Sequence, residues 1–294
     1  MKLFFRSALC LSMAVAAGFL GCALFPEAQS QTLRLLLEDG SAVFMDADEY
    51  LFGVLAGEMP ASFPEEALKA QAVASRSYAA RICSTGRHGE NTLCTRSCCQ
   101  ICLTEQQCRD KWGKDYDFYA EKLRSCIAAT EGQLLRYGGE PAEACFHASS
   151  LGCTESSEAL WGQPVPYLVS VSSPESRDTV PKLVTERRFR SEELASLLGG
   201  GAESGIGECS RDSAGRVASM ELMGKRYSGG EIRTLLGLRS TDFTVSYADG
   251  EYVFTVNGYG HGVGMSQYGA KLMAEQGSDY REILAHYYPG TVLG

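Results

Sequence analysis

A single carboxylate near the start of the chain has an unusual setting. Glu58 follows an almost wholly apolar stretch, residues 51–56, and precedes Met59 and Pro60. Because a proline disfavours helical geometry in the residue before it, we expect a helix to end at Glu58. Apolar surroundings raise the pKa of a carboxyl group, as a general acid requires. Glu58 is therefore the candidate catalytic acid, and a solvated carboxylate at a helix end is the alternative.

Clustered thiols with a nearby imidazole indicate a metal site. Within twelve residues the chain supplies one His and three Cys, and zinc prefers four nitrogen or sulfur ligands. The candidate ligands are His88, Cys94, Cys98 and Cys99. Their spacing is not that of a standard zinc finger, and three further thiols compete, namely Cys83, Cys102 and Cys108. A loop held by disulfides is the alternative.

Glycine occupies every other position from Gly258 to Gly264. This pattern allows close backbone approach and positive φ, so a ligand or a helix can pack directly against the chain. It is not a phosphate loop, because no Lys-Ser/Thr pair follows. We interpret His261 as a structural or cleft-lining residue, since no carboxylate or second His stands at metal-ligand spacing. Ser266 is expected to cap a helix that continues to about residue 275.

Residues 50–80 and 256–290 together closely resemble the stage II sporulation protein D family, also called the SpoIID/LytB domain. The stretch CFHASSLGCT, residues 145–154, is similar to the family's F-H-S-x-S-G-G-x-T segment. The resemblance implies a peptidoglycan lytic transglycosylase with Glu58 at the position of its catalytic acid. It also implies a zinc site of pattern H-x5-C-x4-H-C. This chain departs from that pattern by one shorter gap and by Cys98 in place of the second His.

Several polar residues within these motifs are candidate contacts to substrate. Arg76 falls in the family's motif, although a structural salt bridge is an alternative role for it. Small hydroxyl side chains beside a glycine suit hydrogen bonds to sugar, and turn capping is the alternative. The candidate substrate-binding residues are Arg76, Ser149, Ser150, Thr154, His261, Ser266 and Gln267.

An alanine-rich helix from Pro64 to about Arg81 is predicted to lie at the centre of the fold. Ser62-x-x-Glu65 has the form of a capping box that would begin this helix. Hairpins are expected at residues 32–46 and 133–147. The predicted fold class is α+β, SpoIID-like, with short antiparallel hairpins around the central helix. A smaller lobe is expected at about 176–255, inside a catalytic domain of residues 31–294.

The first 30 residues read as a targeting segment. Lys2 and Arg6 precede an uncharged run from Ala8 to Phe25, which is just long enough to span a membrane. We therefore expect a single N-terminal membrane anchor with the catalytic domain outside the cytoplasm, and secretion after signal cleavage is the alternative. The net charge of −9 argues against binding to nucleic acid, whose partners are basic.

A lone acid fits a lytic transglycosylase, because paired-carboxylate glycosidases need two acids and no second one recurs near Glu58 in a comparable setting. The resemblance implies glycan strands stripped of stem peptides as substrate, and engulfment during endospore formation as the setting. It implies a cell-wall amidase and a membrane protein as partners. The alternative is a non-catalytic glycan-binding protein that modifies a cell-wall amidase.

Overall fold

The computed structural model describes residues 32–37, 39–95, 99–199 and 205–294. The anchor expected at residues 1–30 lies outside these ranges. Within them, none of the helices has the length and apolar character needed to cross a bilayer.

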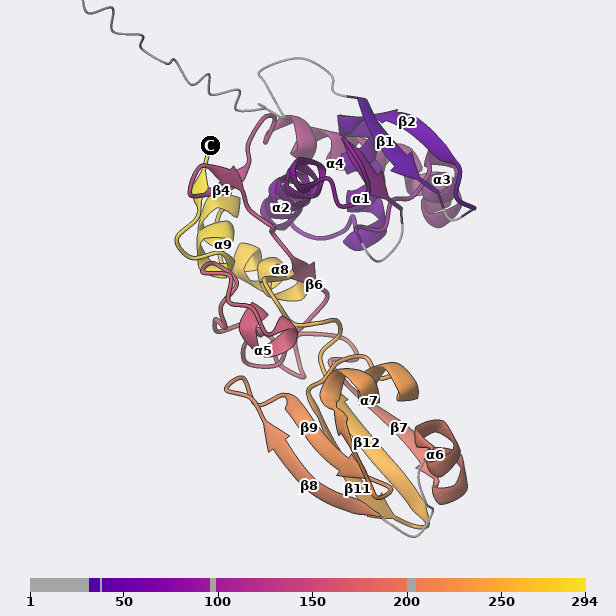
Figure 1. Cartoon of the computed structure of the whole chain (residues 1–294). Coiled ribbons are helices and arrows are strands. Elements are labelled where there is room, and N and C mark those ends of the chain that lie inside the picture. The colour runs from indigo at the N-terminus through magenta and orange to yellow at the C-terminus, as the bar shows by residue number, and fades with distance from the viewer. Residues whose placement is uncertain (1–31, 38, 96–98, 200–204) are drawn as a thin grey trace, which may run out of the picture.

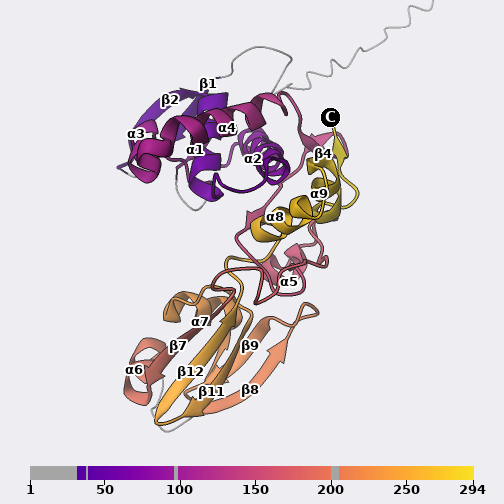
Figure 2. The same cartoon turned by 180° about the vertical axis from the view of Figure 1, so that it is seen from behind.

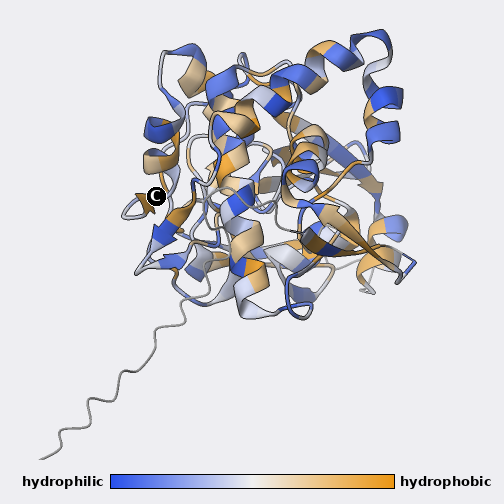
Figure 3. Cartoon of the chain, turned by 90° about the horizontal axis from the view of Figure 1, so that it is seen from above, coloured by the Kyte–Doolittle hydropathy of each residue, from blue (hydrophilic) through white to orange (hydrophobic). Residues whose placement is uncertain are grey.

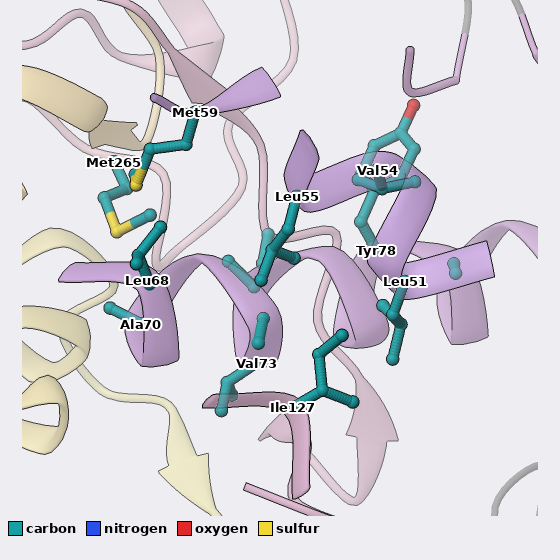
Figure 4. Close-up of a cluster of buried hydrophobic side chains, with 14 of the residues drawn as sticks. Leu51, Val54, Leu55, Met59, Leu68, Ala70, Val73, Tyr78, Ile127 and Met265 are labelled. Carbon is teal, nitrogen blue, oxygen red and sulfur yellow. The ribbon is translucent and has the colours of Figure 1, made fainter. Parts of the chain in front are cut away.

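Two consecutive helices carry the candidate acid and the centre of the fold. Helix α1 (Ala47–Glu58) begins at Asp46, whose carboxylate accepts hydrogen bonds from two backbone N–H groups of the first turn. It ends at Glu58, as predicted, because Met59 is extended (φ −126°, ψ 140°) before its proline. Helix α2 (Glu65–Thr85) packs against α1, and apolar side chains of the two helices meet along the contact (Figure 4).

The predicted capping box at the start of α2 was wrong. The N-cap residue is Pro64, which has no hydroxyl group, and its side chain makes no capping hydrogen bond. A turn closed by the Phe63 N–H and the Pro60 carbonyl oxygen (2.9 Å) leads the chain into the helix instead. In the first turn, the Glu66 carboxylate accepts the Tyr280 N–H at 2.9 Å and so ties α2 to the C-terminal part of the chain.

Helix α2 is covered by helices from both ends of the chain, as its many alanines allow (Figures 1 and 2). These helices are α1, α4 (Tyr116–Ala128), α8 (Gln267–Glu275) and α9 (Tyr280–Tyr287). Met59 and Met265 lie side by side at this junction (Figure 4). Seen from above, hydrophilic and hydrophobic segments are interspersed along the helices (Figure 3). The main core is therefore built from sequence segments about 200 residues apart.

Small sheets surround this helical centre, which confirms the predicted α+β class. The N-terminal hairpin forms as predicted, and a short third strand pairs with its first strand in parallel. The predicted hairpin at 133–147 forms only in part, because Phe146 and His147 leave it to pair in parallel with Met265 and Ser266. The strands of the main body are β1 (Thr32–Leu36), β2 (Ala42–Asp46), β3 (Thr92–Cys94), β4 (Leu135–Tyr137), β5 (Glu140–Pro141), β6 (Phe146–His147), β13 (Met265–Ser266) and β14 (Val292–Leu293). Its further helices are α3 (Glu105–Trp112), a 3-10 turn (Gly113–Asp115) and α5 (Ser157–Trp161).

A smaller lobe with its own hydrophobic core lies at the far end from α2 (Figure 1). Phe254 is fully buried at its centre between Phe189 and Phe243. Two three-stranded antiparallel sheets, ordered β11-β12-β7 and β10-β9-β8, form the lobe together with two helices. Its elements are β7 (Val184–Arg190), α6 (Ser191–Leu198), β8 (Ile206–Arg211), β9 (Val217–Leu222), β10 (Lys225–Ser228), α7 (Gly229–Leu236), β11 (Phe243–Ala248) and β12 (Glu251–Asn257). The loop that follows β12 returns the chain to the main body.

Candidate active-site cleft

A cleft of about 640 Å³ opens beside the end of α1. Its walls come from segments that are far apart in the sequence. Its polar lining is Glu58, Tyr78, Arg87, Glu143, Gln163 and His261. The rest of the lining is Cys99, Ile101, Cys145, Phe146, Trp161, Val165 and Leu168. Such a mixture of apolar wall and a few convergent polar groups is typical of a site for a small molecule or a chain segment.

Glu58 has the surroundings that a general acid needs. Burial raises the pKa of its carboxyl group, and a hydrogen bond from the Ile101 N–H to Oε1 (2.7 Å) opposes part of that rise. The residue also ends a helix, where the negative pole of the helix dipole disfavours an additional negative charge. The arrangement favours a protonated carboxyl group with one oxygen fixed in place and the other able to carry the proton.

Two glycines in α1 allow the backbone that holds Glu58 to come this close. A Cβ atom on Gly57 would stand 2.8 Å from the Ile101 carbonyl oxygen, and one on Gly53 would stand 2.5 Å from the Leu103 carbonyl oxygen. The Leu103 N–H donates to the Gly53 carbonyl oxygen at 3.0 Å. Sequence analysis missed this contact, although glycines four residues apart on one helix face are a signal of close backbone approach.

The lining of the cleft also contains an exposed indole beside a neutral imidazole. Trp161, at the end of α5, is 50% exposed, and its ring centre lies 6.0 Å from that of His261. Burial and the charge of Arg233 lower the pKa of His261 to about 4, and its Nδ1 accepts the Val263 N–H at 3.1 Å. At neutral pH His261 is therefore an uncharged hydrogen-bonding group beside an apolar platform that suits a sugar ring.

The loop that presents His261 depends on glycine for its path. Gly264 has φ +72°, and a Cβ atom there would lie 2.0 Å from the Cys145 carbonyl oxygen. Only a residue without a side chain can pass so close to the strand that follows Cys145. The predicted close approach at the alternating glycines is thus an approach to the protein's own backbone.

A second carboxylate, which sequence analysis did not identify, lines the same cleft. Glu143 forms an ion pair with Arg87 (2.8 Å), and its backbone N–H donates to the Tyr167 hydroxyl at 2.8 Å. A second guanidinium nitrogen of Arg87 donates to the Tyr78 hydroxyl at 3.3 Å. Glu143 follows Glu58 by 85 residues in the sequence, and the fold brings both carboxylates to one cleft. No local motif marks Glu143. Unlike Glu58, it is engaged by a charged partner.

Of the predicted substrate contacts, His261 lines the cleft and Arg76 has another role. Arg76 is only 3% exposed. Its guanidinium donates to the backbone carbonyl oxygens of Thr130 (2.7 Å), Ile127 (3.3 Å) and Gln133 (3.3 Å), at the end of α4. These bonds add a charged donor to carbonyl groups that follow the helix, of which those of Ile127 and Thr130 also accept a backbone N–H. We therefore interpret Arg76 as a residue that joins α2 to the end of α4.

The remaining predicted contacts are also buried in the protein rather than in the lining of the cleft. They are Ser149, Ser150, Thr154, Ser266 and Gln267. Ser266 caps α8, as expected, and its hydroxyl also bonds to the Glu175 carboxylate. The Thr154 hydroxyl accepts the Val171 N–H at 2.9 Å, and the Gln267 amide donates to Gln71 at 3.4 Å. In this structure these polar groups bind other parts of the chain.

Ser150 belongs to a buried polar network between the main body and the smaller lobe. Its hydroxyl lies 2.6 Å from His147 Nε2 and accepts from the Arg216 guanidinium at 3.0 Å. Arg216 comes from the smaller lobe and forms an ion pair with Glu155 at 3.5 Å. The Ser150 N–H donates to Glu175 at 3.0 Å. A network of this kind fixes the lobe at one position relative to the cleft.

Three of the four predicted metal ligands lie together beside the cleft. One ligand atom each of His88, Cys94 and Cys99 falls within 4.8 Å of the others, and His88 Nε2 is 3.2 Å from the Cys99 sulfur. The fourth, Cys98, lies outside the described residues. Cys94 is disulfide-bonded here, whereas Cys99 is a free thiol. The competing thiols Cys83, Cys102 and Cys108 are also free.

Comparison with known proteins identifies the family. The model of a family described as "Stage II sporulation protein" (SpoIID) matches residues 41–137, which include Glu58 and the cysteine-rich loop. "Stage II sporulation protein D" of Bacillus amyloliquefaciens is 40% identical over 251 residues, covering 83% of this chain and 73% of that protein. The chain belongs to the stage II sporulation protein D family.

Two further relatives widen the comparison within the SpoIID family. "Stage II sporulation protein D" of Bacillus subtilis (strain 168) is 37% identical over 253 residues, covering 84% of this chain and 74% of that protein. A protein of the same strain named "Amidase enhancer" is 29% identical over 301 residues, which cover 83% of this chain and 40% of that protein. The resemblance drawn from the two sequence stretches is thus confirmed over most of the chain.

Proposed function

We propose that this SpoIID-family protein is a peptidoglycan lytic transglycosylase. Its substrate bond would be the glycosidic bond between N-acetylmuramic acid and N-acetylglucosamine. The observation that carries the proposal is Glu58, a carboxyl group with a raised pKa, fixed by the Ile101 N–H in a cleft wide enough for sugar residues. The exposed indole of Trp161 in the same cleft supports a glycan as the ligand.

In the proposed reaction Glu58 first protonates the glycosidic oxygen, and the bond to C1 of the muramoyl residue breaks. The Ile101 N–H stabilises the carboxylate that this transfer leaves behind. The carboxylate then takes the proton of the muramoyl 6-hydroxyl as that oxygen bonds to C1. The products are a free 4-hydroxyl on N-acetylglucosamine and a 1,6-anhydro end, and no water is consumed.

Glu143 does not change this proposal into a two-acid mechanism. A retaining or inverting glycosidase needs its second carboxylate free to attack C1 or to activate water. Glu143 is engaged by Arg87 at 2.8 Å, which neutralises its charge. A mechanism with one acid, in which the substrate's own hydroxyl is the nucleophile, uses the cleft as it stands.

The biological setting is also part of the proposal. Glycan strands stripped of stem peptides would be the substrate, during the septal wall remodelling of engulfment in endospore formation. A cell-wall amidase and a membrane protein would be partners, and residues 1–30 would anchor the protein with its catalytic domain outside the cytoplasm. The names of the relatives support a role in sporulation, and the "Amidase enhancer" name supports a link to an amidase.

A second candidate function is favoured by that same relative. A protein named "Amidase enhancer" need not cut glycan, so this chain would then hold glycan strands and modify the amidase.

One experiment separates the two functions. After incubation with amidase-treated peptidoglycan, mass spectrometry should detect 1,6-anhydro ends on the released fragments. Intact strands that remain bound to the protein would favour the modifier.

We also propose that the cysteine-rich loop binds structural zinc through His88, Cys94, Cys98 and Cys99. Ligand atoms around one zinc ion stand about 3.5 to 3.8 Å apart. The three described donors lie within 4.8 Å of one another, so a small adjustment would bring them to that spacing. With four protein ligands no position remains for water, so the ion would stabilise the loop and take no part in chemistry. Binding requires a free Cys94 thiolate, and the disulfide seen at Cys94 is the competing state.

Cys99→Ser is expected to lower zinc content and thermal stability together. Cys99 lies two residues before Ile101, so loss of the metal should also disturb the segment that holds Glu58. Metal analysis of protein purified under reducing conditions should give one zinc per chain, and less than half of that for the variant. Cys209→Ser is the control, since Cys209 is an exposed free thiol in the smaller lobe. A metal-free, fully active protein with mapped disulfides in this loop would contradict the proposal.

A further inference from the structure

The ion pair in the cleft has capacity for another partner. Arg87 and Glu143 are 42% and 31% exposed along their side chains, and both line the cleft that Glu58 also lines. A guanidinium carries five N–H donors in a planar fork. Among the residues that the structure describes, the Arg87 guanidinium donates to Glu143 and to the Tyr78 hydroxyl, which leaves further donors for a ligand in the cleft.

A planar guanidinium is the side chain best suited to bind a carboxylate, through two parallel hydrogen bonds. Among the sugars of the proposed substrate, only the muramoyl residue can offer one, on its lactyl group. That carboxyl is an uncharged amide while a stem peptide is attached, and it becomes a carboxylate once the peptide has been removed. Charge on this group therefore distinguishes a stripped strand from a peptide-bearing one.

We propose that Arg87 binds the free lactyl carboxylate of a muramoyl residue and thereby selects peptide-free strands. This inference rests on the proposed function, because it assumes that glycan occupies the cleft. Tyr78 and Glu143 hold the guanidinium in position, so it does not have to be ordered when the strand binds. Glu143 also lowers affinity, because its negative charge lies next to that of the incoming carboxylate.

The two members of the pair should consequently affect binding in opposite directions. Arg87→Gln removes the cation and should weaken binding of stripped strands about 10- to 100-fold, as expected for loss of a charged hydrogen bond. Glu143→Gln keeps a hydrogen-bonding side chain, removes the competing charge and should strengthen the same binding several-fold. A role limited to holding the loop in place would make both variants weaker.

Binding is measured by calorimetry in the Glu58→Gln background, so that strands stay intact. The probes are amidase-stripped strands and the same strands with every lactyl carboxyl converted to a methylamide, which removes the charge but adds little bulk. Arg87→Gln should reduce the affinity for stripped strands to that for methylamide strands, and should leave the latter unchanged. Arg226→Gln is the matched control, since it breaks a 2.6 Å ion pair on the smaller lobe.

Each outcome decides the inference. Equal weakening toward both probes, or equal affinity of the unsubstituted Arg87 protein for both, overturns it. If Arg87→Gln does not fold, two other variants test the inference. Arg87→Lys keeps the positive charge but lacks the planar guanidinium, and Glu143→Gln is expected to bind stripped strands more tightly. The readout needs no cleavage. A protein that discriminates between the probes but forms no anhydro ends keeps this inference and loses only the proposed activity.

Discussion

Glu58→Gln should abolish most glycan cleavage and leave glycan binding intact. The amide keeps the size of the side chain and can still accept the Ile101 N–H, but it has no proton to give to the glycosidic oxygen. Loss of a general acid lowers rates by roughly 10²- to 10⁴-fold. Release of 1,6-anhydro muropeptides from amidase-treated peptidoglycan, followed by mass spectrometry, measures the effect. Near-normal release by this variant would disprove the assignment of Glu58.

The pH dependence of cleavage gives an independent reading of the same carboxyl group. Burial raises the pKa of Glu58, so the protonated form persists to higher pH than for an ordinary glutamate. Activity should therefore fall as the pH rises through that raised pKa, because the acid is then lost. Any residual activity of Glu58→Gln should lack this fall. Glu140→Gln, which changes an exposed carboxylate outside the cleft, is the control and should keep the full profile.

Arg76→Met should reduce stability strongly and affect sugar binding little. The substitution keeps an apolar stem of similar shape but removes the charged donor of three carbonyl oxygens at or just after the end of α4, two of which keep a backbone N–H partner. At about 1.5 to 3 kcal/mol for each hydrogen bond to a charged donor, and with some relaxation, a loss of about 3 to 5 kcal/mol is expected. For a chain of this size that lowers the melting temperature by roughly 10 °C.

Arg188→Met is the matched control for Arg76→Met. Arg188 is half-exposed and pairs with an equally exposed Glu186, so its replacement should change stability by less than about 0.5 kcal/mol. Thermal unfolding is measured across the whole transition, and glycan affinity is measured well below the melting temperature of the variant. An Arg76→Met protein with unchanged stability but much weaker glycan binding would restore the substrate-binding role that the sequence motif suggested.

Local signals in the sequence predicted the elements that depend on them. The proline after Met59 marked the end of α1 at Glu58, and Ser266 marked the start of α8. In each of these cases, a residue and its neighbours within one or two helical turns determine the structure.

The parts of the site that sequence analysis missed depend on contacts between distant residues. Whether Arg76 faces a ligand or the end of α4 is decided by residues 51 to 57 positions away. Ser150 reads as a sugar-binding hydroxyl until Arg216 of the smaller lobe is placed beside it. Glu143 and Glu58 line the same cleft only because the fold brings these distant residues together. The spacing of residues along the chain says little about such long-range contacts. The chemistry of Glu58, in contrast, was predicted from its residue type and its apolar neighbours in the sequence.

The position of the two cleft walls in the sequence sets the order in which the protein can acquire activity during synthesis. Glu58 and its helix are made early, but His261 and the α8 and α9 helices that cover α2 are made about 200 residues later. Until then α2 has exposed apolar faces and Glu58 lacks the part of the cleft that contains His261. Under the proposed function, a nascent or truncated chain is therefore expected to be inactive, and contacts between such distant segments are expected to form slowly.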